Sequence, residues 1–350
     1  MVRLGASDLH VPAGSPPYLR VDGDLVRIEM PALTHEQNLK MFEEIMPERL
    51  LPEFRERKQV DFIYCLDDTA RFRANVFVQR FGASAVFRLI PARVLSAQEL
   101  GLPDALIRLC ELRKGLVLVT GPTGSGKSTT LAAMIDHINR TRPAHIITVE
   151  DPIEFIHASQ KALITQRQVG EHVGSFAESL RAALREDPDI VLVGEMRDLE
   201  TISQAITAAE TGHLVFGTLH TNSAVKTVDR IIDAFPTNQQ EQVRVMLSEG
   251  LRGVVSQVLL KRAEGKGRIA AYEILIGTPA LSALIRENKT HQIPSLMQTQ
   301  RALGMCSMDQ ALLDLVKQNR VTIEEASQYA QDRKFFEAAA GRPRVLDPST

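Results

Sequence analysis

Residues Gly121 to Ser128 have the types and the spacing of a phosphate-binding loop. In the stretch TGPTGSGKSTT, Gly121, Gly126, Lys127 and Ser128 occupy the four fixed places of the pattern G-x-x-x-x-G-K-[S/T]. Glycines have no Cβ atom, so successive backbone N–H groups can curl around a β-phosphate. Lys127 then reaches the β- and γ-phosphate oxygens, and the Ser128 hydroxyl is a ligand for Mg²⁺. The pattern predicts that the chain binds a nucleoside triphosphate, taken to be ATP, with Mg²⁺.

The residues on either side predict the elements that hold this loop. GLVLV, residues 115–119, has the composition of a buried strand, and LAAMIDHI, residues 131–138, that of a helix. A loop between them lies at the start of the helix, where the partial positive charge favours phosphate. This context argues against a chance Gly-rich turn. The expected cofactor-binding residues are Gly121, Pro122, Thr123, Gly124, Ser125, Gly126, Lys127, Ser128 and Thr129.

Two glutamates come at the ends of other apolar strands, Glu150 in HIITVE and Glu195 after DIVLVG. A carboxylate at the C-terminal edge of a parallel strand lies beside the phosphate loop, where it can orient the attacking water or hold Mg²⁺ through water. Gly194 stands where many such enzymes carry Asp, so direct ligation of the metal is not expected. We predict Glu150 as the general base and Glu195 as the residue that orders metal-bound water. The residues alone leave these roles exchangeable, and a purely structural capping role for both remains the alternative.

His213 and His220 flank the apolar run LVFGTL. Their odd separation on a strand points them to opposite faces, although the strand ends and Gly217 can relax this. Three threonines stand nearby, so sensing of the γ-phosphate and a structural role are both open for the histidines. Metal ligation is not expected, because no third ligand has suitable spacing.

Four arginines, Arg71, Arg73, Arg80 and Arg88, accompany a predicted hairpin, in which RFRANVFVQR and SAVFRLIP are the strands and residues 81–83 the turn. Two interpretations are open from spacing alone. The arginines can form a solvated face, or they can stabilise negative charge on the phosphoryl group of a neighbouring nucleotide.

The composition indicates a globular chain long enough for two domains. Its 350 residues are 44% hydrophobic and 24% charged, as in ordinary soluble proteins. A balance of 41 Lys and Arg against 43 Asp and Glu gives a net charge of -2, which provides no overall attraction for nucleic acid. The chain has no Trp and only 5% aromatic residues, so few bases could stack on it. No nucleic-acid partner is expected.

The cysteines and apolar runs bear on the compartment. Cys65, Cys110 and Cys306 lie far apart and form no CxxC pair, so neither a zinc ribbon nor a disulfide framework is expected. The start, MVRLGASDLH, has no apolar signal region, and no apolar run reaches the roughly 18 residues that span a bilayer. We expect a cytoplasmic protein with no membrane span, whose membrane role depends on a partner.

The chain is predicted to be α/β and to have four parts. Residues 1–95 form an α+β domain, with a helix over residues 34–46 that a Thr34 and Gln37 capping box begins. Residues 96–280 alternate apolar strands, at 115–119, 145–150, 189–195 and 213–220, with helical stretches, which predicts a parallel sheet covered by helices. Residues 281–340 are helical, at 281–287, 308–318 and 322–330, and residues 341–350 are predicted to be disordered.

Four ordered stretches, GPTGSGKSTTLA, ITVEDPIEF, DPDIVLVGEMRD and TAAETGHLVFGTLHTNSA, resemble the secretion ATPase superfamily that drives type IV pili and type II secretion. Within it the chain is most similar to the pilus retraction motors. The resemblance runs from GASDLHVPAGSPPYLRVDGDL, which begins at Gly5, to about Ala330. It implies a PAS-like N-terminal domain, then a RecA-like P-loop ATPase domain with C-terminal helices, and a hexameric ring with ATP between the domains.

The resemblance also assigns residues. The family's Walker A motif falls on residues 121–128, its Asp box on 150–154, its Walker B motif on 194–195, and its His box on His213 and His220. Its arginines that reach the nucleotide fall on Arg73 and Arg88, which decides between the two interpretations of the hairpin arginines. The implied catalytic residues are therefore Glu150, Glu195, Arg73, Arg88, His213 and His220, with Ser128 and, through water, Glu195 at Mg²⁺.

Two features favour retraction motors over their relatives. The chain lacks the tetracysteine metal site and longer N-terminal part that extension motors usually carry, and it has the stretch ALSALIRE at residues 280–287, which keeps the LIRE half of a helix typical of retraction motors. The family usually has a further helix before GASDLH, and MVRL is too short for it. Either the start is incomplete or that helix is dispensable.

The function that the resemblance implies is Mg²⁺-dependent ATP hydrolysis coupled to retraction of a pilus at the inner face of the cytoplasmic membrane. The implied partners are five further copies of the chain, an inner-membrane pilus platform protein and a paralogous motor ATPase. The alternatives are a related secretion or DNA-transfer ATPase, a non-hydrolysing accessory subunit, and a helicase-like translocase. The intact phosphate loop and glutamates argue against the accessory subunit.

Overall fold

The computed structural model describes residues 1–21, 23–67, 69–90, 93–331 and 333–339. The predicted disordered tail at 341–350 lies outside the described residues. The chain divides into two compact units, one of Met1–Arg93 with Glu154–Ile156, the other of Val94–Ile153 with His157–Thr350. The domain boundaries placed at residues 95 and 280 stay predictions.

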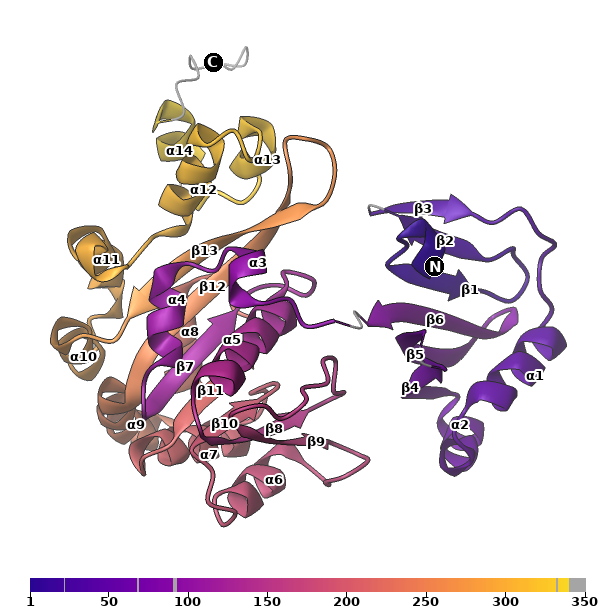
Figure 1. Cartoon of the computed structure of the whole chain (residues 1–350), viewed down its shortest axis with the longest axis horizontal. Coiled ribbons are helices and arrows are strands. Elements are labelled where there is room, and N and C mark those ends of the chain that lie inside the picture. Colours follow the sequence, from indigo (N-terminus) through magenta and orange to yellow (C-terminus); the bar gives the residue numbers. More distant parts are fainter. Residues whose placement is uncertain (22, 68, 91–92, 332, 340–350) are drawn as a thin grey trace. The chain divides into compact units, whose positions relative to one another are not determined.

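The first unit is a six-stranded antiparallel sheet with helices (Figure 1). Its strands stand in the order β3-β2-β1-β6-β5-β4. Their bounds are β1 Asp8–Val11, β2 Tyr18–Val21, β3 Asp24–Arg27, β4 Gln59–Leu66, β5 Ala70–Gln79 and β6 Gly82–Ile90. The helices are α1 His35–Ile45 and α2 Leu51–Arg57, with short 3-10 turns at Val2–Leu4 and Glu48–Leu50. Phe42 of α1 and Phe54 of α2 are buried against strand residues such as Phe87, so the helices and the sheet share one core.

Two local predictions for this unit can be compared with the structure. Helix α1 begins at the predicted capping box, in which Thr34 Oγ1 accepts from the Gln37 N–H at 3.3 Å and Gln37 Oε1 accepts from the Thr34 N–H at 2.9 Å. The β5–β6 hairpin is confirmed, but its turn is shorter than predicted, because Gln79 already pairs with Gly82. Gly82 has a φ of 126°, and a Cβ there would lie 2.5 Å from His35 Cβ, so the close approach of α1 requires glycine.

The second unit is a seven-stranded sheet in the order β13-β12-β7-β11-β10-β8-β9. All neighbouring strands are parallel except β13, which runs antiparallel to β12. The bounds are β7 Gly115–Thr120, β8 His145–Glu150, β9 Leu163–Gln168, β10 Ile190–Val193, β11 Leu214–Leu219, β12 Leu251–Lys261 and β13 Arg268–Ile276. The predicted parallel sheet is therefore confirmed, with β10 and β11 shorter than their apolar runs.

Helices cover both faces of this sheet. Their bounds are α3 Ala97–Leu100, α4 Asp104–Cys110, α5 Lys127–Thr141, α6 Phe176–Ala183, α7 Leu199–Glu210, α8 Ala224–Asp233 and α9 Thr237–Gly250. All six residues of β7 are buried, and they alternate between two cores. Leu116 and Leu118 face the core formed with α7, α8 and α9, whereas Val117 and Val119 face the core formed with α4 and α5. Burial on both faces explains why the strands are continuously apolar.

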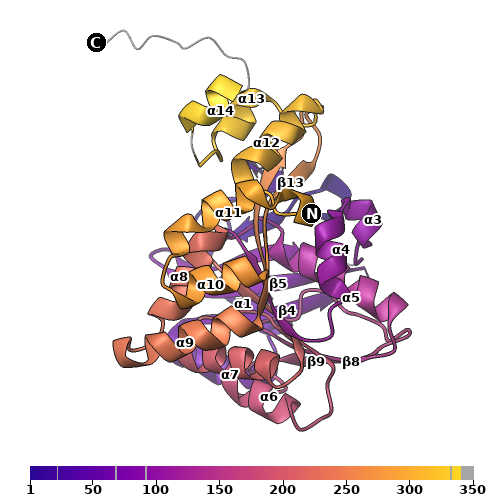
Figure 2. The ribbon, with the colours of Figure 1, turned by 90° about the vertical axis from the view of Figure 1, so that its left-hand side faces the viewer.

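The C-terminal helices pack on the same unit. They are α10 Pro279–Arg286, α11 Ile293–Thr299, α12 Met308–Lys317, α13 Ile323–Ser327 and α14 Arg333–Ala339, with 3-10 turns at Thr290–Gln292 and Arg301–Leu303. Figure 2 shows α10 beside α9, against which it packs through Leu281 and Ile285. The helices α12, α13 and α14 share a separate core with the far ends of β12 and β13. Helix α13 is shorter than the predicted 322–330. In the part of the chain that the structure describes, no helix is long and apolar enough to cross a membrane.

Candidate nucleotide-binding site

The fold brings the ends of four strands to one edge of the second sheet. Strands β7, β11, β10 and β8 are parallel neighbours, so their carboxyl ends meet at this edge. The phosphate loop follows β7, Glu195 follows β10, His220 follows β11, and Glu150 is the last residue of β8. The sheet topology thus gathers the loop and three of the predicted catalytic residues.

The phosphate loop owes its shape to three glycines. Gly121, Gly124 and Gly126 have φ angles of 145°, 80° and 89°, a region that residues with a Cβ rarely adopt. Gly121 also has no room for a side chain, because a Cβ there would lie 2.3 Å from the Gln257 carbonyl oxygen. Gly126 caps helix α5, whose first residue is Lys127. The loop therefore ends at a helix N-terminus, as a phosphate site requires.

Lys127 lies across the loop it follows. Its Nζ donates to the carbonyl oxygens of Gly121 at 2.8 Å and Pro122 at 3.1 Å. Ser128 is exposed, as are residues 122–124 at the tip of the loop, so the loop is open to solvent where a phosphate would enter. The nine residues predicted to bind the cofactor are consecutive in this loop and the start of α5, and their binding role stays a proposal.

Glu150 and Glu195 have different surroundings. Glu150 Oε1 accepts hydrogen bonds from Thr148 Oγ1 at 2.7 Å and from Gln166 Nε2 at 3.2 Å. Both of these donors are uncharged. Glu195 forms ion pairs with Arg197 and, at 2.9 Å from its Oε1, with His220 Nε2.

Burial acts to raise the pKa of Glu195, but the hydrogen bonds and charges of Arg197 and His220 outweigh it and lower the pKa below its ordinary value. The hydrogen bond between Arg197 and Glu195 also raises the pKa of Arg197. Glu195 is thus held as a carboxylate, which suits electrostatic and metal-water roles better than proton abstraction.

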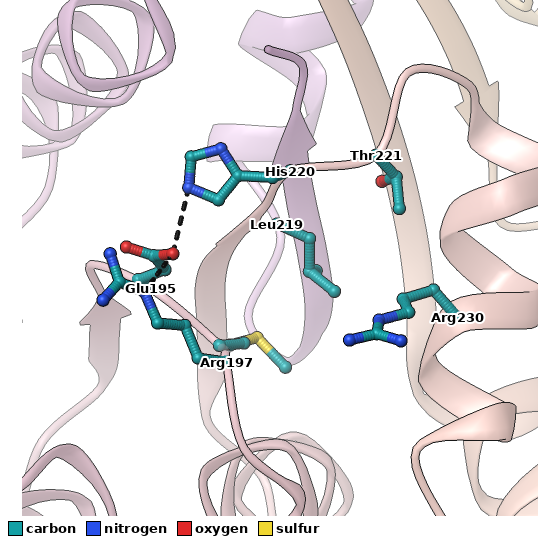
Figure 3. Close-up of a pocket in the computed structure, with 7 residues that line it drawn as sticks. Glu195, Arg197, Leu219, His220, Thr221 and Arg230 are labelled. Atoms are coloured by element: carbon teal, nitrogen blue, oxygen red, sulfur yellow. Dashed lines mark ion pairs between the residues drawn. The ribbon is translucent and has the colours of Figure 1, made fainter. Parts of the chain in front are cut away.

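A pocket of about 430 Å³ opens beside Glu195. Residues 195–197 and 219–221 line it together with Arg230 of α8. Figure 3 shows Glu195 between Arg197 and His220, with the Arg230 side chain reaching toward them from the helix. Thr221 Oγ1 lies 2.6 Å from Thr227 Oγ1 of α8, a hydrogen bond that fixes the loop after His220 to this helix.

The position before Glu195 holds Gly194 where many such enzymes carry Asp, and the contacts of Gly194 explain why. Its N–H donates to the Val149 carbonyl at 2.7 Å, and a Cβ would lie 3.0 Å from that oxygen and 3.1 Å from Glu150 Cα. A side chain at 194 would therefore press on the end of β8. Glycine lets the two glutamate-bearing segments approach each other.

The structure does not bring His213 to this edge. His213 precedes β11 and its carbonyl accepts from the Gly115 N–H at the start of β7. It is separated from His220 by a six-residue strand, or about 20 Å. Its Nδ1 instead lies 3.0 Å from the Ala208 carbonyl oxygen. The two histidines thus stand at opposite ends of one strand, and a catalytic role for His213 stays a prediction.

Arg73 and Arg88 belong to the first unit. They face each other as partners on β5 and β6. Arg88 Nε lies 2.8 Å from Asp8 Oδ1, and Arg73 Nε lies 3.6 Å from Asp61 Oδ1. The two residues are therefore neighbours, and each has an acidic partner in its own unit. Their role at the nucleotide stays a proposal.

Three residues of this region were not predicted from the sequence. Gln257 of β12 is hydrogen bonded to the phosphate loop, Arg197 pairs with Glu195, and Arg230 lines the pocket. Arg197 stands two positions after Glu195, which is a signal that the sequence offered. Gln257 and Arg230 gave no such signal, because only the fold places their elements beside the site.

Comparison with known proteins agrees with this geometry. A family model described as "Type II/IV secretion system protein" matches residues 1–328. The chain belongs to this family, and it is an ATPase. The predicted fold class, an N-terminal PAS-like domain followed by a RecA-like ATPase domain, is confirmed.

The names of individual relatives are more specific than the family description. The chain is 54% identical to the "Type IV pilus retractation ATPase PilT" of Pseudomonas aeruginosa, covering 95% of this chain and 97% of that one. It is 55% identical to a "Twitching motility protein" of Neisseria gonorrhoeae, covering 90% and 84%. A solved structure, "Crystal Structure of the Pilus Retraction Motor PilT and Bound ADP", superposes with a TM-score of 0.87 at 51% identity and covers 96% of each chain.

Proposed function

We propose that this chain is a motor ATPase that couples ATP hydrolysis to the retraction of type IV pili. The observation that carries the proposal is the shared edge of the second sheet, where the phosphate loop, Glu150, Glu195 and His220 stand together. This arrangement supplies a phosphate cradle and two carboxylates from one chain. The identity of 54% to a pilus retraction ATPase over 95% of the chain supports the cellular role.

The binding groups follow from the loop. In the described residues, no group of three or more His, Cys, Asp or Glu side chains could hold a metal ion, and Mg²⁺ in ATPases takes most of its ligands from phosphate and water. The exposed Ser128 hydroxyl suits such a site, and the ion would neutralise charge on the phosphates. Lys127 exchanges its two carbonyl acceptors for β- and γ-phosphate oxygens.

The two glutamates have different roles in hydrolysis. Glu195, kept ionised by Arg197 and His220, accepts hydrogen bonds from water at the metal. Glu150 is the last residue of β8, at the edge where the phosphate loop lies, and its Oε1 accepts hydrogen bonds from Thr148 and Gln166. This position suits it to accept the proton of the attacking water as the general base. His220 follows β11 and pairs with the Glu195 carboxylate. It therefore connects this strand to the site and can sense the bound phosphate.

Movement comes from the first unit. Arg73 and Arg88, which are neighbours on β5 and β6, can stabilise the negative charge of a γ-phosphate, and they lose that partner when phosphate leaves. Each hydrolysis step then changes what these two arginines of the first unit bind. Six copies in a ring convert these steps into work on an inner-membrane platform protein at the cytoplasmic face, with a paralogous motor as a further partner.

The test is deletion of the gene, with surface pili labelled and extension and retraction events counted in single cells. We expect cells crowded with pili that extend but do not shorten. The wild-type gene should restore retraction, whereas a gene carrying Lys127→Ala, matched in expression, should not. Bald cells would indicate an extension motor. Unchanged pili would show that this ATPase does not act on the pilus. Phosphate release by the purified chain separates an active motor from an accessory subunit.

A further inference from the structure

A glutamine from a distant strand is hydrogen bonded to the phosphate loop. Gln257 lies on β12 and is 2% exposed. Its Nε2 donates to the Ser125 carbonyl oxygen at 2.7 Å, and its Oε1 accepts from the Thr130 hydroxyl at 2.8 Å. Ser125 belongs to the loop and Thr130 to the first turns of α5. One amide side chain therefore joins the loop to the helix that follows it.

The glycines of the loop allow this close approach. A Cβ on Gly126 would lie 2.9 Å from Gln257 Nε2, and a Cβ on Gly121 would lie 2.3 Å from the Gln257 carbonyl oxygen. Both distances are shorter than any ordinary contact of a Cβ atom, so the backbone of the loop touches residue 257 at two points. The loop is shaped against β12 as well as for a phosphate.

Strand β12, which carries Gln257, is held in register with β7. Ser256 pairs with Thr120, the last residue of β7, and their hydroxyl oxygens lie 2.7 Å apart. Both residues are buried. Gln257 is thus presented to the loop from a strand that cannot slide along β7 without breaking this hydrogen bond.

The hydrogen bond to Ser125 has a directional consequence. The peptide bond between Ser125 and Gly126 is trans, so its C=O and N–H point in opposite directions. Because the C=O is held toward Gln257, the Gly126 N–H points away from that side chain. A rotation of this peptide would turn a carbonyl oxygen toward a bound phosphate, and the partial negative charge on that oxygen would repel the phosphate.

We propose that Gln257 is a positioning residue that aims the Gly126 N–H into the phosphate site by holding the Ser125 carbonyl away from it. The inference rests on the proposed function, because it assumes that a nucleotide binds at the loop. Gln257 touches no reacting atom. Its effect on nucleotide affinity passes through the Ser125–Gly126 peptide.

Two substitutions separate its hydrogen bonds. Gln257→Glu has the same shape and still accepts from Thr130, but it places a carboxylate oxygen against the Ser125 carbonyl. Gln257→Met removes both bonds with similar volume. Gln239→Glu, the same chemical change on the exposed surface of α9, is the matched control.

The measurement is titration of the purified full-length chain with fluorescent analogues of ADP and ATP, together with KM and kcat for phosphate release. Both Gln257 variants should bind about tenfold more weakly or worse, since a hydrogen bond between buried groups is lost. KM should rise in proportion. A merely structural role would instead lower the fraction of folded enzyme and leave KM unchanged.

Thr130 provides the second pair, in case the Gln257 variants do not fold. Thr130→Val removes the hydroxyl donor and should weaken nucleotide binding, whereas Thr130→Ser keeps the donor and should restore it. Wild-type affinity in folded Gln257→Glu and Gln257→Met would overturn the inference while the proposed function stands. Absence of nucleotide binding by the wild-type chain would overturn both.

Discussion

Glu273 connects the starts of two helices inside the second unit. It is 3% exposed, and its Oε1 accepts from the Ala224 N–H, the first of α8, at 2.6 Å. Its Oε2 accepts from the Met308 N–H, the first of α12, at 3.3 Å and from Gln331 Nε2 at 2.8 Å. The helices themselves provide no acceptor for their first N–H groups. We predict that Glu273→Ala destabilises the starts of both helices together.

The size of the effect follows from the three donors. Each buried donor left without an acceptor costs roughly 1–3 kcal/mol, so the loss of all three amounts to about 3–9 kcal/mol. Removal of a buried carboxyl group offsets part of this, because burial raises the pKa of Glu273 and so disfavours its charged form. We expect a net loss of roughly 2–5 kcal/mol. Glu273→Gln keeps one acceptor oxygen and should lose less.

The assay is hydrogen exchange of the folded chain, since the unfolding of two units need not be a single transition. In Glu273→Ala, amides in the first turns of α8 and α12 should both exchange at least about tenfold faster. Glu264→Ala, in the exposed turn between β12 and β13, is the control and should leave both unchanged. Faster exchange at α12 alone, with α8 as protected as in the wild type, would refute the proposed connection.

Three further predictions concern the nucleotide site. Lys127→Ala should reduce phosphate release by about 100-fold or more, because a cation at the developing charge is lost; a steady-state phosphate assay checks this. Glu195→Gln should flatten the pH dependence of stability in acid. The lowered pKa of Glu195 means that its ion pairs stabilise the fold above the ordinary value of 4.5 and are lost as pH falls through the lowered value. Urea unfolding between about pH 6 and about pH 3 is the measurement. Gly194→Ala should lower kcat several-fold with unchanged nucleotide affinity, because its Cβ would lie 3.1 Å from Glu150 Cα; equal kcat would contradict this.

The catalytic edge was predictable because it depends on local patterns and one rule of topology. Residues 145–150 were expected as a strand and form β8, His145–Glu150, without change. Parallel strands place their carboxyl ends together, so the sequence was sufficient to group Glu150, Glu195 and the phosphate loop. The same rule explains the position of His213, since a residue before a strand lies at the opposite edge from a residue after it.

Contacts that depend on the order of the strands in the sheet could not be predicted from the sequence. Gln257 is 132 residues from Ser125, and Glu273 is 49 residues from Ala224. Neither residue stands in a motif, and a buried glutamine on an apolar strand has no periodic signal. Only the placement of β12 beside β7, and of β13 beyond it, brings these side chains to their partners.

The β12–β13 pair connects the two sets of contacts. Gln257 pairs with Tyr272, and Ser256 pairs with Glu273, so the residue that holds the phosphate loop and the residue that holds α8 and α12 stand on neighbouring rungs. Any displacement of β12 along β7 would break the hydrogen bond of Ser256 to Thr120 and move both contacts at once. A change at the phosphates that shifts β12 would therefore reach the C-terminal helices through buried polar side chains, and α8 would carry the same change to the loop after His220.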